Sequence, residues 1–234
     1  MATYKIAELL VKMETFGRTL AQAEPYRVAD CGQVDIVIRS KPEALQKNHP
    51  HLSLDDCEYL LTGGSFYTGL IHFQGILLHS SCVVVDNRAY CFTAPCGTGK
   101  STHVRLWLEL FGPRAYILND DKPALRVIDG EIFVFGTPWS GKNDCSRNCR
   151  VPFGGIAMVR RAGENAITQM NPDAAFFTLL DQTVRSGAEQ NMNACINTAG
   201  KLVETGKIFE LFCNMDISAA RLSYETMSGK RFEP

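Results

Sequence analysis

A short run of small and polar residues, placed between an apolar run and a helical run, constrains the fold more than any other feature of the sequence. It reads Ala94-Pro95-Cys96-Gly97-Thr98-Gly99-Lys100-Ser101-Thr102. Residues 89–93 are apolar enough for a buried strand, and residues 102–111 carry apolar side chains at helical spacing. A strand, a glycine-rich turn and a helix in this order form a phosphate loop, in which backbone N–H groups turn inward around an anion. We therefore expect a nucleotide-binding α/β fold.

Side chains of this segment supply the other contacts that a nucleoside triphosphate needs. Lys100 is expected to reach the β- and γ-phosphates, and the Ser101 hydroxyl to bind Mg²⁺. The predicted nucleotide-binding set is Cys96, Gly97, Thr98, Gly99, Lys100, Ser101 and Thr102. The usual pattern opens with Gly where this chain has Ala94, which fits if the local φ is negative. A glycine-rich turn that merely precedes a helix is the alternative. His103 could lie near the nucleotide, although an exposed position on the helix is the more common place for a His.

Two adjacent acids, Asp120 and Asp121, follow a short apolar run at residues 116–118. A strand after the helix should return beside the first strand, so that its end faces the phosphates. One carboxylate can then bind Mg²⁺ while the other accepts a proton from an acceptor hydroxyl. An acidic turn in solvent is the alternative for this pair.

These motifs together resemble a known family. Leu78-His79, residues 82–85, the phosphate loop and Asn119-Asp120-Asp121 are similar to the catalytic domain of HPr kinase/phosphorylase and, more distantly, to the nucleotide core of phosphoenolpyruvate carboxykinases. The resemblance covers roughly residues 70–160. It implies an α/β (α+β) fold, a P-loop core with a mixed, strongly twisted sheet. Residues 1–68 would then be a small N-terminal α+β portion, and residues 69–234 the nucleotide-binding catalytic domain.

The resemblance also implies roles for individual residues. His79 stands at the family's distance ahead of the phosphate loop and would lie near the transferred phosphate, although a lone His on an apolar strand is more often a core residue. Asp120 would be the general base and Asp121 the metal ligand, an order that the sequence leaves open. Ala94 and Cys96 depart from the family's loop. The family's motif near its protein acceptor has no match, which argues against HPr itself as the acceptor.

A second polar loop, residues 136–143, follows a predicted hairpin. Its Trp139 and Lys142 suit a substrate wall, and Lys142 could stabilise charge on the moving phosphoryl group. Arg147 and Arg150 lie nearby in sequence and could grip an anion. The alternative is a surface loop in which Trp139 covers the core and the Arg side chains are solvated.

These assignments predict a Mg²⁺-dependent kinase that transfers a nucleotide phosphoryl group to a hydroxyl of a small molecule, a peptide or a protein serine. The predicted catalytic set is His79, Lys100, Asp120 and Lys142. Ser101 and Asp121 would hold the metal. ATP is the expected donor, with ADP, GTP and pyrophosphate left open. A nucleotide-binding regulatory module and a PEP carboxykinase-like lyase are the alternatives.

Composition limits the other classes of function. The formal net charge is −1, without the clustered Lys and Arg of nucleic-acid binding, and no apolar run approaches the roughly 20 residues that span a bilayer. The N-terminus lacks a secretory pattern, so we expect a cytoplasmic protein without a membrane partner. The nine Cys residues form no CxxC pair and no zinc set, which is typical of reduced thiols. A homo-oligomer stays open.

The remaining pattern predicts the order of elements. Residues 4–14 are expected to form one strand, and Ser53 to cap a helix that Gly63-Gly64 ends. Asp129-Gly130 is a favoured hairpin turn. The expected strands are 35–39, 76–78, 82–85, 89–93, 116–118, 125–128, 132–135, 156–159 and 208–212, and the expected helices after the phosphate loop are 102–111, 172–204 and 217–227.

Overall fold

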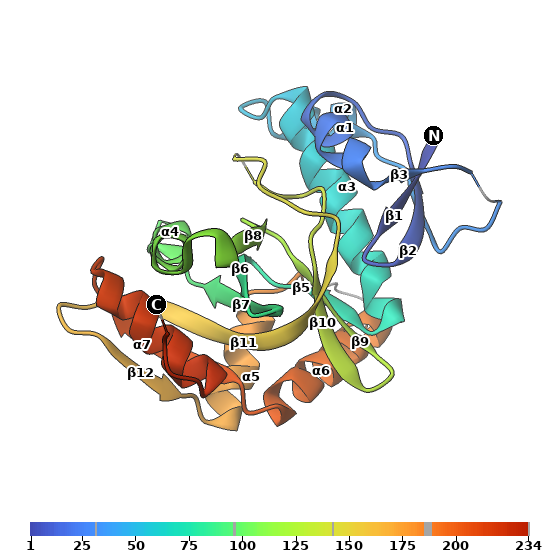
Figure 1. Ribbon diagram of the computed structural model, residues 1–234. Coiled ribbons are helices and arrows are strands. Elements are labelled where there is room, and N and C mark those ends of the chain that lie inside the picture. The colour runs from blue at the N-terminus through green and yellow to red at the C-terminus, as the bar shows by residue number, and fades with distance from the viewer. Residues whose placement is uncertain (31, 96, 142, 185–188, 234) are drawn as a thin grey trace.

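The computed structural model describes residues 1–30, 32–95, 97–141, 143–184 and 189–233 (Figure 1). The chain forms a four-stranded sheet near the N-terminus, with strand order β3-β1-β2-β4, and a larger curled sheet. The larger sheet has the order β5-β9-β10-β11-β7-β6-β8, and β13 pairs with both β11 and β12. Its pairs are both parallel and antiparallel, so the fold is a mixed α/β fold, as the sequence predicts.

The elements have the following bounds. The strands are β1 (Ala2–Ile6), β2 (Leu9–Met13), β3 (Arg27–Val28), β4 (Ile36–Ile38), β5 (Gly75–Leu77), β6 (Ser80–Val85), β7 (Arg88–Thr93), β8 (Tyr116–Asn119), β9 (Ala124–Ile128), β10 (Glu131–Phe135), β11 (Arg150–Arg161), β12 (Ala166–Gln169) and β13 (Ile208–Cys213). The α-helices are α1 (Gly17–Ala23), α2 (Pro42–Asn48), α3 (Leu54–Leu70), α4 (Lys100–Phe111), α5 (Pro172–Asp181), α6 (Glu189–Glu204) and α7 (Ile217–Ser228). Three short 3-10 helices are η1 (Glu24–Tyr26), η2 (Ile71–Phe73) and η3 (Gly112–Arg114).

The first strands form a hairpin, so the prediction of one strand over residues 4–14 is wrong. β1 and β2 pair antiparallel, with Ile6 opposite Leu9. Ala7 and Glu8 between them have φ values of 50° and 65°. A two-residue turn with positive φ at both central positions is of type I′, a requirement that sequences usually meet with Asn and Gly. Ala-Glu lacks that signal, and the alternation of the flanking strands hides the turn.

Helix α3 begins where the sequence predicts but continues through Gly63-Gly64, where the predicted stop is wrong. The Ser53 hydroxyl accepts a hydrogen bond from the Asp56 amide and caps the helix. A Cβ on Gly63 would lie 2.9 Å from Trp139 Cδ1. The glycine therefore makes room for a packed indole rather than ending the helix. The predicted domain boundary after residue 68 falls in the last turn of this helix.

The order of the larger sheet brings the segments of interest to one edge. β7 leads into the phosphate-loop segment and β8 leads into the acid pair, but the two strands do not pair with each other. β6 lies between them and is antiparallel to both. The carboxyl ends of β7 and β8 and the amino end of β6 therefore meet at the same edge. The expectation that β8 returns directly beside β7 is wrong. The acid pair nevertheless lies at the same sheet edge as the phosphate-loop segment, as expected.

Helices cover both faces of the larger sheet (Figure 1). Successive side chains of β6 alternate between these faces. Val83 and Val85 pack with α4 and α7, and Cys82 and Val84 pack with α5 and α6. Every residue of β6 is buried, as predicted for a strand covered on both faces.

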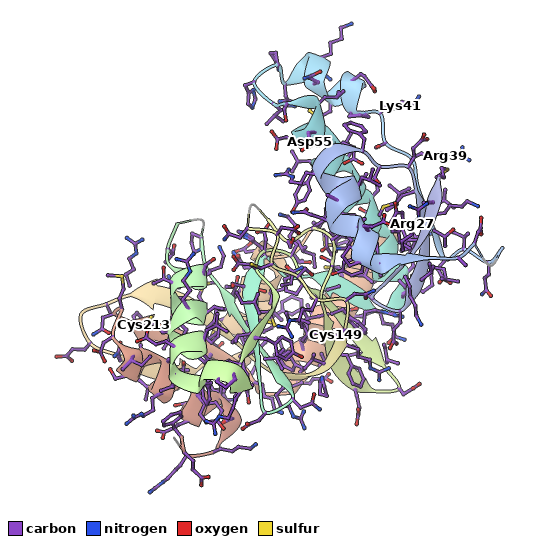
Figure 2. All side chains as sticks on the ribbon, turned by 45° about the horizontal axis from the view of Figure 1, so that its top comes forward. Arg27, Arg39, Lys41, Asp55, Cys149 and Cys213 are labelled. Atoms are coloured by element: carbon purple, nitrogen blue, oxygen red, sulfur yellow. The ribbon has the colours of Figure 1, made fainter. Side chains whose placement is uncertain are left out.

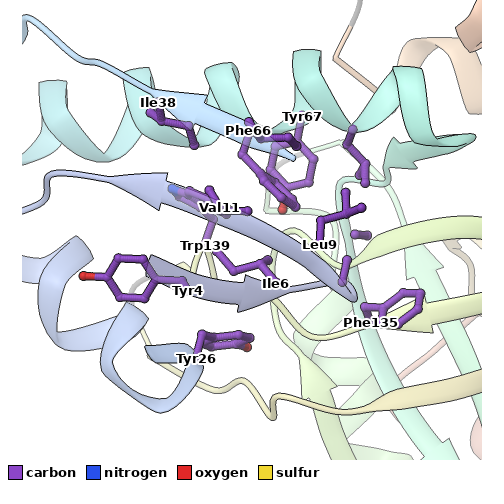
Figure 3. Close-up of a cluster of buried hydrophobic side chains, with 14 of the residues drawn as sticks. Tyr4, Ile6, Leu9, Val11, Tyr26, Ile38, Phe66, Tyr67, Phe135 and Trp139 are labelled. Carbon is purple, nitrogen blue, oxygen red and sulfur yellow. The ribbon is translucent and has the colours of Figure 1, made fainter. Parts of the chain in front are cut away.

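One hydrophobic cluster joins the N-terminal sheet and α3 to the larger sheet (Figure 3). Trp139 is fully buried in it and stacks on Phe66, with ring centroids 4.9 Å apart. Phe133 and Phe135 of β10 belong to the same cluster as Tyr4 of β1. The N-terminal portion therefore packs firmly against the segment that follows β10.

Within the described part of the chain, none of the helices has the length and apolar character needed to cross a bilayer.

Candidate active site

The phosphate-loop segment connects β7 to α4, the context that the sequence predicts. Gly97 and Gly99 have φ values of 75° and 125°, a region that side chains other than glycine rarely adopt. Ala94 is not among the residues with positive φ, so its methyl group costs no backbone strain. The first turn of α4 directs free N–H groups towards this loop, which is the arrangement that favours an anion.

Two cationic side chains brace the loop from within the protein. Lys100 Nζ donates to the Ala94 carbonyl at 2.9 Å and spans the loop. Arg161, at the end of β11, donates to the carbonyls of Gly97 at 2.6 Å and Thr98 at 3.0 Å. Arg161 is a site residue that the sequence does not predict, because nothing in the pattern shows that β11 ends beside the loop. Cys96, in the predicted binding set, lies outside the described residues.

Asp120 is bound by hydroxyl and amide groups from three separate elements. Its Oδ1 accepts hydrogen bonds from Ser101 Oγ at 3.0 Å and from Ser81 Oγ at 2.5 Å. Its Oδ2 accepts from Asn143 Nδ2 at 3.0 Å. Ser81 was missed by the sequence analysis, although two serines at the start of an otherwise apolar strand are a recognisable signal. Asp120 thus lies directly against the first turn of α4.

Asp121 turns to a different set of partners. Its Oδ1 lies 3.4 Å from His79 Nε2, and its Oδ2 pairs with Lys122 Nζ. Burial alone would raise the pKa of Asp121, but the His79 hydrogen bond and the Lys122 charge outweigh burial and hold this pKa below its ordinary value. Asp121 therefore remains a carboxylate at neutral pH. His79 is half-buried in the link between β5 and β6.

Asn119, the residue before the acid pair, fixes the turn that separates the two carboxylates. It is fully buried, and its Oδ1 accepts hydrogen bonds from the amides of Asp121 at 3.0 Å and Lys122 at 2.7 Å. Its Nδ2 donates to the Thr137 carbonyl at 3.0 Å. An Asn that caps a turn in this way is a local motif, so its place ahead of two acids could have been recognised.

The predictions for the second polar loop are only partly tested by the structure. We define the site loop as residues 136–141 and 143–146, since Lys142 lies outside the described residues. Trp139 is a core residue, so its interpretation as a substrate wall is wrong. Arg147 stacks over Tyr116 at 4.2 Å and Arg150 over Phe133 at 3.6 Å. Both Arg side chains therefore have packing roles.

His103 is buried, contrary to the expectation of an exposed helical residue. Its Nε2 lies 3.0 Å from Ser223 Oγ, and its ring packs against Phe92. Burial lowers the pKa of His103 to about 4, so the ring is neutral at physiological pH. Its role is to join α4 to α7 within the core.

A cavity of about 470 Å³ opens directly beside the phosphate-loop segment. It is lined by Thr98, Gly99, Thr102, His103, Leu106, Val159, Arg161, Ala162, Cys213, Asn214 and Met215. Figure 2 shows Cys213, at the end of β13, beside α4. The size lies in the range of small-molecule sites. The described residues that line the cavity present mostly apolar groups and no carboxylate.

The metal-binding capacity near the loop is limited to a few oxygen atoms. Among the residues that the structure describes, no three His, Cys, Asp or Glu side chains gather as a metal site. The Ser101 hydroxyl and the Asp120 carboxylate are oxygen donors, which are the ligands that Mg²⁺ prefers. Mg²⁺ commonly takes one or two protein oxygens and completes its shell with phosphate and water, so this set fits the ion.

A scan against protein-family models and a search of curated proteins each gave no match. A search of solved structures found a likeness to the HPr(Ser) kinase/phosphatase from Coxiella burnetii, at 13% identity and a TM-score of 0.26. The match covers 40% of this chain and 77% of that one. At that TM-score the likeness supports no conclusion about activity.

Proposed function

We propose that this chain is a Mg²⁺-dependent phosphotransferase that moves the γ-phosphoryl group of a nucleoside triphosphate to a hydroxyl acceptor. The observation that supports it best is the meeting of the phosphate-loop segment with a divided acid pair at one sheet edge. Asp120 contacts Ser101 of the loop, whereas Asp121 contacts His79. A phosphate loop beside one metal-side acid and one separate acid is what phosphoryl transfer requires.

The loop holds the phosphates in this proposal. Backbone N–H groups around Gly97 and Gly99 and the start of α4 bind the β-phosphate. Lys100 leaves the Ala94 carbonyl and turns to the β- and γ-phosphates. Arg161 keeps the loop carbonyls turned away from the anion, because its guanidinium binds two of them. These contacts position the γ-phosphorus and stabilise the charge on the departing oxygen.

The geometry favours the reverse of the acid order that the family resemblance implies and that the sequence leaves open. Asp120 lies against the Ser101 hydroxyl, so Asp120 and Ser101 would hold Mg²⁺ rather than Asp121 and Ser101. When bound there, Mg²⁺ would neutralise charge on the phosphate oxygens. Ser81 and Asn143 orient the Asp120 carboxylate through its two oxygens.

Asp121 then serves as the general base. It accepts the proton of the acceptor hydroxyl while the acceptor oxygen forms its bond to the γ-phosphorus and the bond to the β–γ bridging oxygen breaks. His79 and Lys122 hold Asp121 as a carboxylate, ready to take that proton. The nucleoside diphosphate leaves with the electron pair of the broken bond.

The cavity beside the loop takes the nucleoside. It begins at Thr98 and Gly99, so a phosphate chain held by the loop continues directly into it. Its apolar walls suit the face of a base. This continuity favours a nucleotide over pyrophosphate as the donor.

A labelling screen tests the proposal. The chain is incubated with Mg²⁺ and γ-labelled ATP against pools of hydroxyl metabolites, serine peptides and proteins, and the products are read by mass. We expect one pool to gain a phosphoryl group with the wild-type chain and to lose that gain in Lys100→Ala and Asp121→Asn. Equal transfer by all three proteins contradicts the assigned residues. ATP binding without transfer to any pool favours a nucleotide-binding regulatory module instead.

A further inference from the structure

The N-terminal portion of the chain binds one residue of the site loop through both of its backbone polar groups. The Gly141 amide donates to Tyr59 Oη at 3.0 Å, and the Gly141 carbonyl accepts from Gln22 Nε2 at 3.2 Å. Tyr59 belongs to α3 and Gln22 to α1. Two side chains from separate helices thus satisfy both backbone groups of a single residue.

Gly141 lies directly against the acid pair. Its φ is 79°, and a Cβ there would be 3.0 Å from Asp121 Cβ. Two residues later, Asn143 donates to Asp120 Oδ2. Gly141 therefore lies against Asp121 and Asn143 binds Asp120, so the positions of these two residues set where each carboxylate points.

Other contacts anchor the two ends of the site loop to the same N-terminal portion. Trp139 Nε1 donates to Thr62 Oγ1 at 3.2 Å, and its ring is buried against α3. At the other end, the hydroxyls of Tyr26 and Ser146 lie 2.6 Å apart. The loop is held at its start, middle and end by residues that precede position 70.

Tyr59 and Gln22 are buried well enough to hold a fixed geometry. Tyr59 is 5% exposed and Gln22 is 6% exposed. Burial is the main cause that raises the pKa of Tyr59 to about 12, so its hydroxyl stays neutral across physiological pH. The guanidinium of Arg18 packs over the Tyr59 ring at 4.0 Å and fixes its plane. A hydrogen bond with a side chain held this rigidly can fix the position of the loop.

We infer that Tyr59 and Gln22 are positioning residues for phosphoryl transfer, which makes the N-terminal portion a working part of the active site. They hold Gly141, which lies against Asp121 and stands two positions before Asn143, the residue that binds Asp120. This inference rests on the proposed function, and it assigns to residues 1–70 a role in turnover rather than in nucleotide binding. None of the described residues that line the nucleoside cavity comes from that portion, and the phosphate loop lies at residues 94–102.

The test compares Tyr59→Phe with Tyr4→Phe, a matched change at another buried tyrosine. The Tyr4 hydroxyl lies 3.5 Å from Thr15 Oγ1, and Tyr4 is 1% exposed in the same core. Two quantities are measured: turnover of Mg²⁺-ATP with water as the acceptor, and hydrogen exchange of the Gly141 amide. In Tyr59→Phe we expect kcat to fall about 10- to 100-fold with KM for ATP unchanged, because a misplaced reacting group costs rate rather than nucleotide affinity. We expect exchange at Gly141 to rise at least about 10-fold as its acceptor is lost. Tyr4→Phe should match the wild-type chain in both.

Gln22→Met supplies a second variant, for the hydrogen bond to the carbonyl of the same residue. Its effect on kcat should not add fully to that of Tyr59→Phe, because both side chains bind the same residue, Gly141. Unchanged kcat and unchanged Gly141 exchange in Tyr59→Phe would overturn the inference. A wild-type chain that binds ATP but transfers its phosphoryl group neither to water nor to any acceptor pool of the labelling screen contradicts the proposed function, and with it the role in turnover. The exchange measurement still decides separately whether Tyr59 holds the loop.

Discussion

The Ser101 hydroxyl lies 3.0 Å from Asp120 Oδ1, although the two residues are 19 positions apart in the chain. The contact joins the first turn of α4 to the end of β8 across the width of β6. It also divides the work of two adjacent acids, because Asp121 turns instead towards His79 at 3.4 Å. The sequence alone does not distinguish Asp120 from Asp121, but their different contacts in the folded chain do.

Substitution of the two acids should give different kinetic phenotypes. Asp121→Asn removes the proton acceptor, so we expect kcat to fall about 10²- to 10⁴-fold with nearly unchanged ATP affinity. Asp120→Asn removes a charged oxygen beside Ser101, so we expect the Mg²⁺ concentration for half-maximal turnover to rise at least about 10-fold. Turnover is measured against Mg²⁺ and ATP concentration for each variant.

Asp173→Asn, at an exposed acid in the first turn of α5, is the control and should leave both quantities unchanged. A raised Mg²⁺ requirement in Asp121→Asn, with only a kcat loss in Asp120→Asn, would restore the order that the family resemblance implies.

The sequence predicted the elements whose signals are local. Each of these signals lies within a few residues of sequence. Examples are the glycines of the phosphate loop, the apolar run of β6 and the Ser53 cap. The position of Asp120 and Asp121 could be predicted because an acid pair directly after a strand lies at a sheet edge.

The rest depends on contacts between distant segments, which one sequence does not display. Arg161 braces a loop more than 60 positions earlier in the chain. Gly63 looked like a helix stop, and only the position of Trp139 shows that it is a packing residue. Tyr59 and Gln22 carry no motif at all, and their relation to Gly141 exists only in the folded chain.

Filling the cavity beside the phosphate loop should separate binding of the base from binding of the phosphates. Ala162 lines this cavity, whereas Ala166 on β12 is exposed and does not. We expect Ala162→Trp to weaken ATP binding at least about 10-fold, because the indole occupies the space of the base, and to leave tripolyphosphate binding unchanged. Calorimetric titration with both ligands measures this difference, and Ala166→Trp serves as the control. Equal losses for ATP and tripolyphosphate in Ala162→Trp would place the base elsewhere.

Acid should destabilise the fold through His103. Its pKa is about 4 in the folded chain against an ordinary 6.5, so the unfolded chain binds a proton that the folded chain rejects. The stability that this neutral ring provides is complete above about pH 6.5 and is lost as the pH falls from there towards 4, by on the order of 3 kcal/mol. Urea unfolding of the wild-type chain and His103→Gln across this range measures it. The variant should show a shallower loss of unfolding free energy, and parallel curves for the two proteins would contradict the role of burial.

Two neighbouring glycines of α3 should respond in opposite directions to the same substitution. Replacing Gly by Ala within a helix normally raises the free energy of unfolding by up to about 1 kcal/mol, because the unfolded chain loses freedom. Gly64 has no atom within 4 Å of an added Cβ, so Gly64→Ala should show that gain. At Gly63 the added Cβ would lie 2.9 Å from Trp139 Cδ1 and 3.1 Å from its Nε1. The indole cannot move away, since it is fully buried and stacked on Phe66.

Gly63→Ala should therefore lower the free energy of unfolding by about 1–3 kcal/mol, the usual cost of overpacking a core. Chemical denaturation of both variants measures the two values. Trp139 lies near the start of the site loop. Gly63→Ala should therefore also speed hydrogen exchange of the amides in the site loop, whereas Gly64→Ala should not. A stabilised Gly63→Ala protein would mean that the indole yields to the new methyl group, and that α3 does not fix the start of the loop.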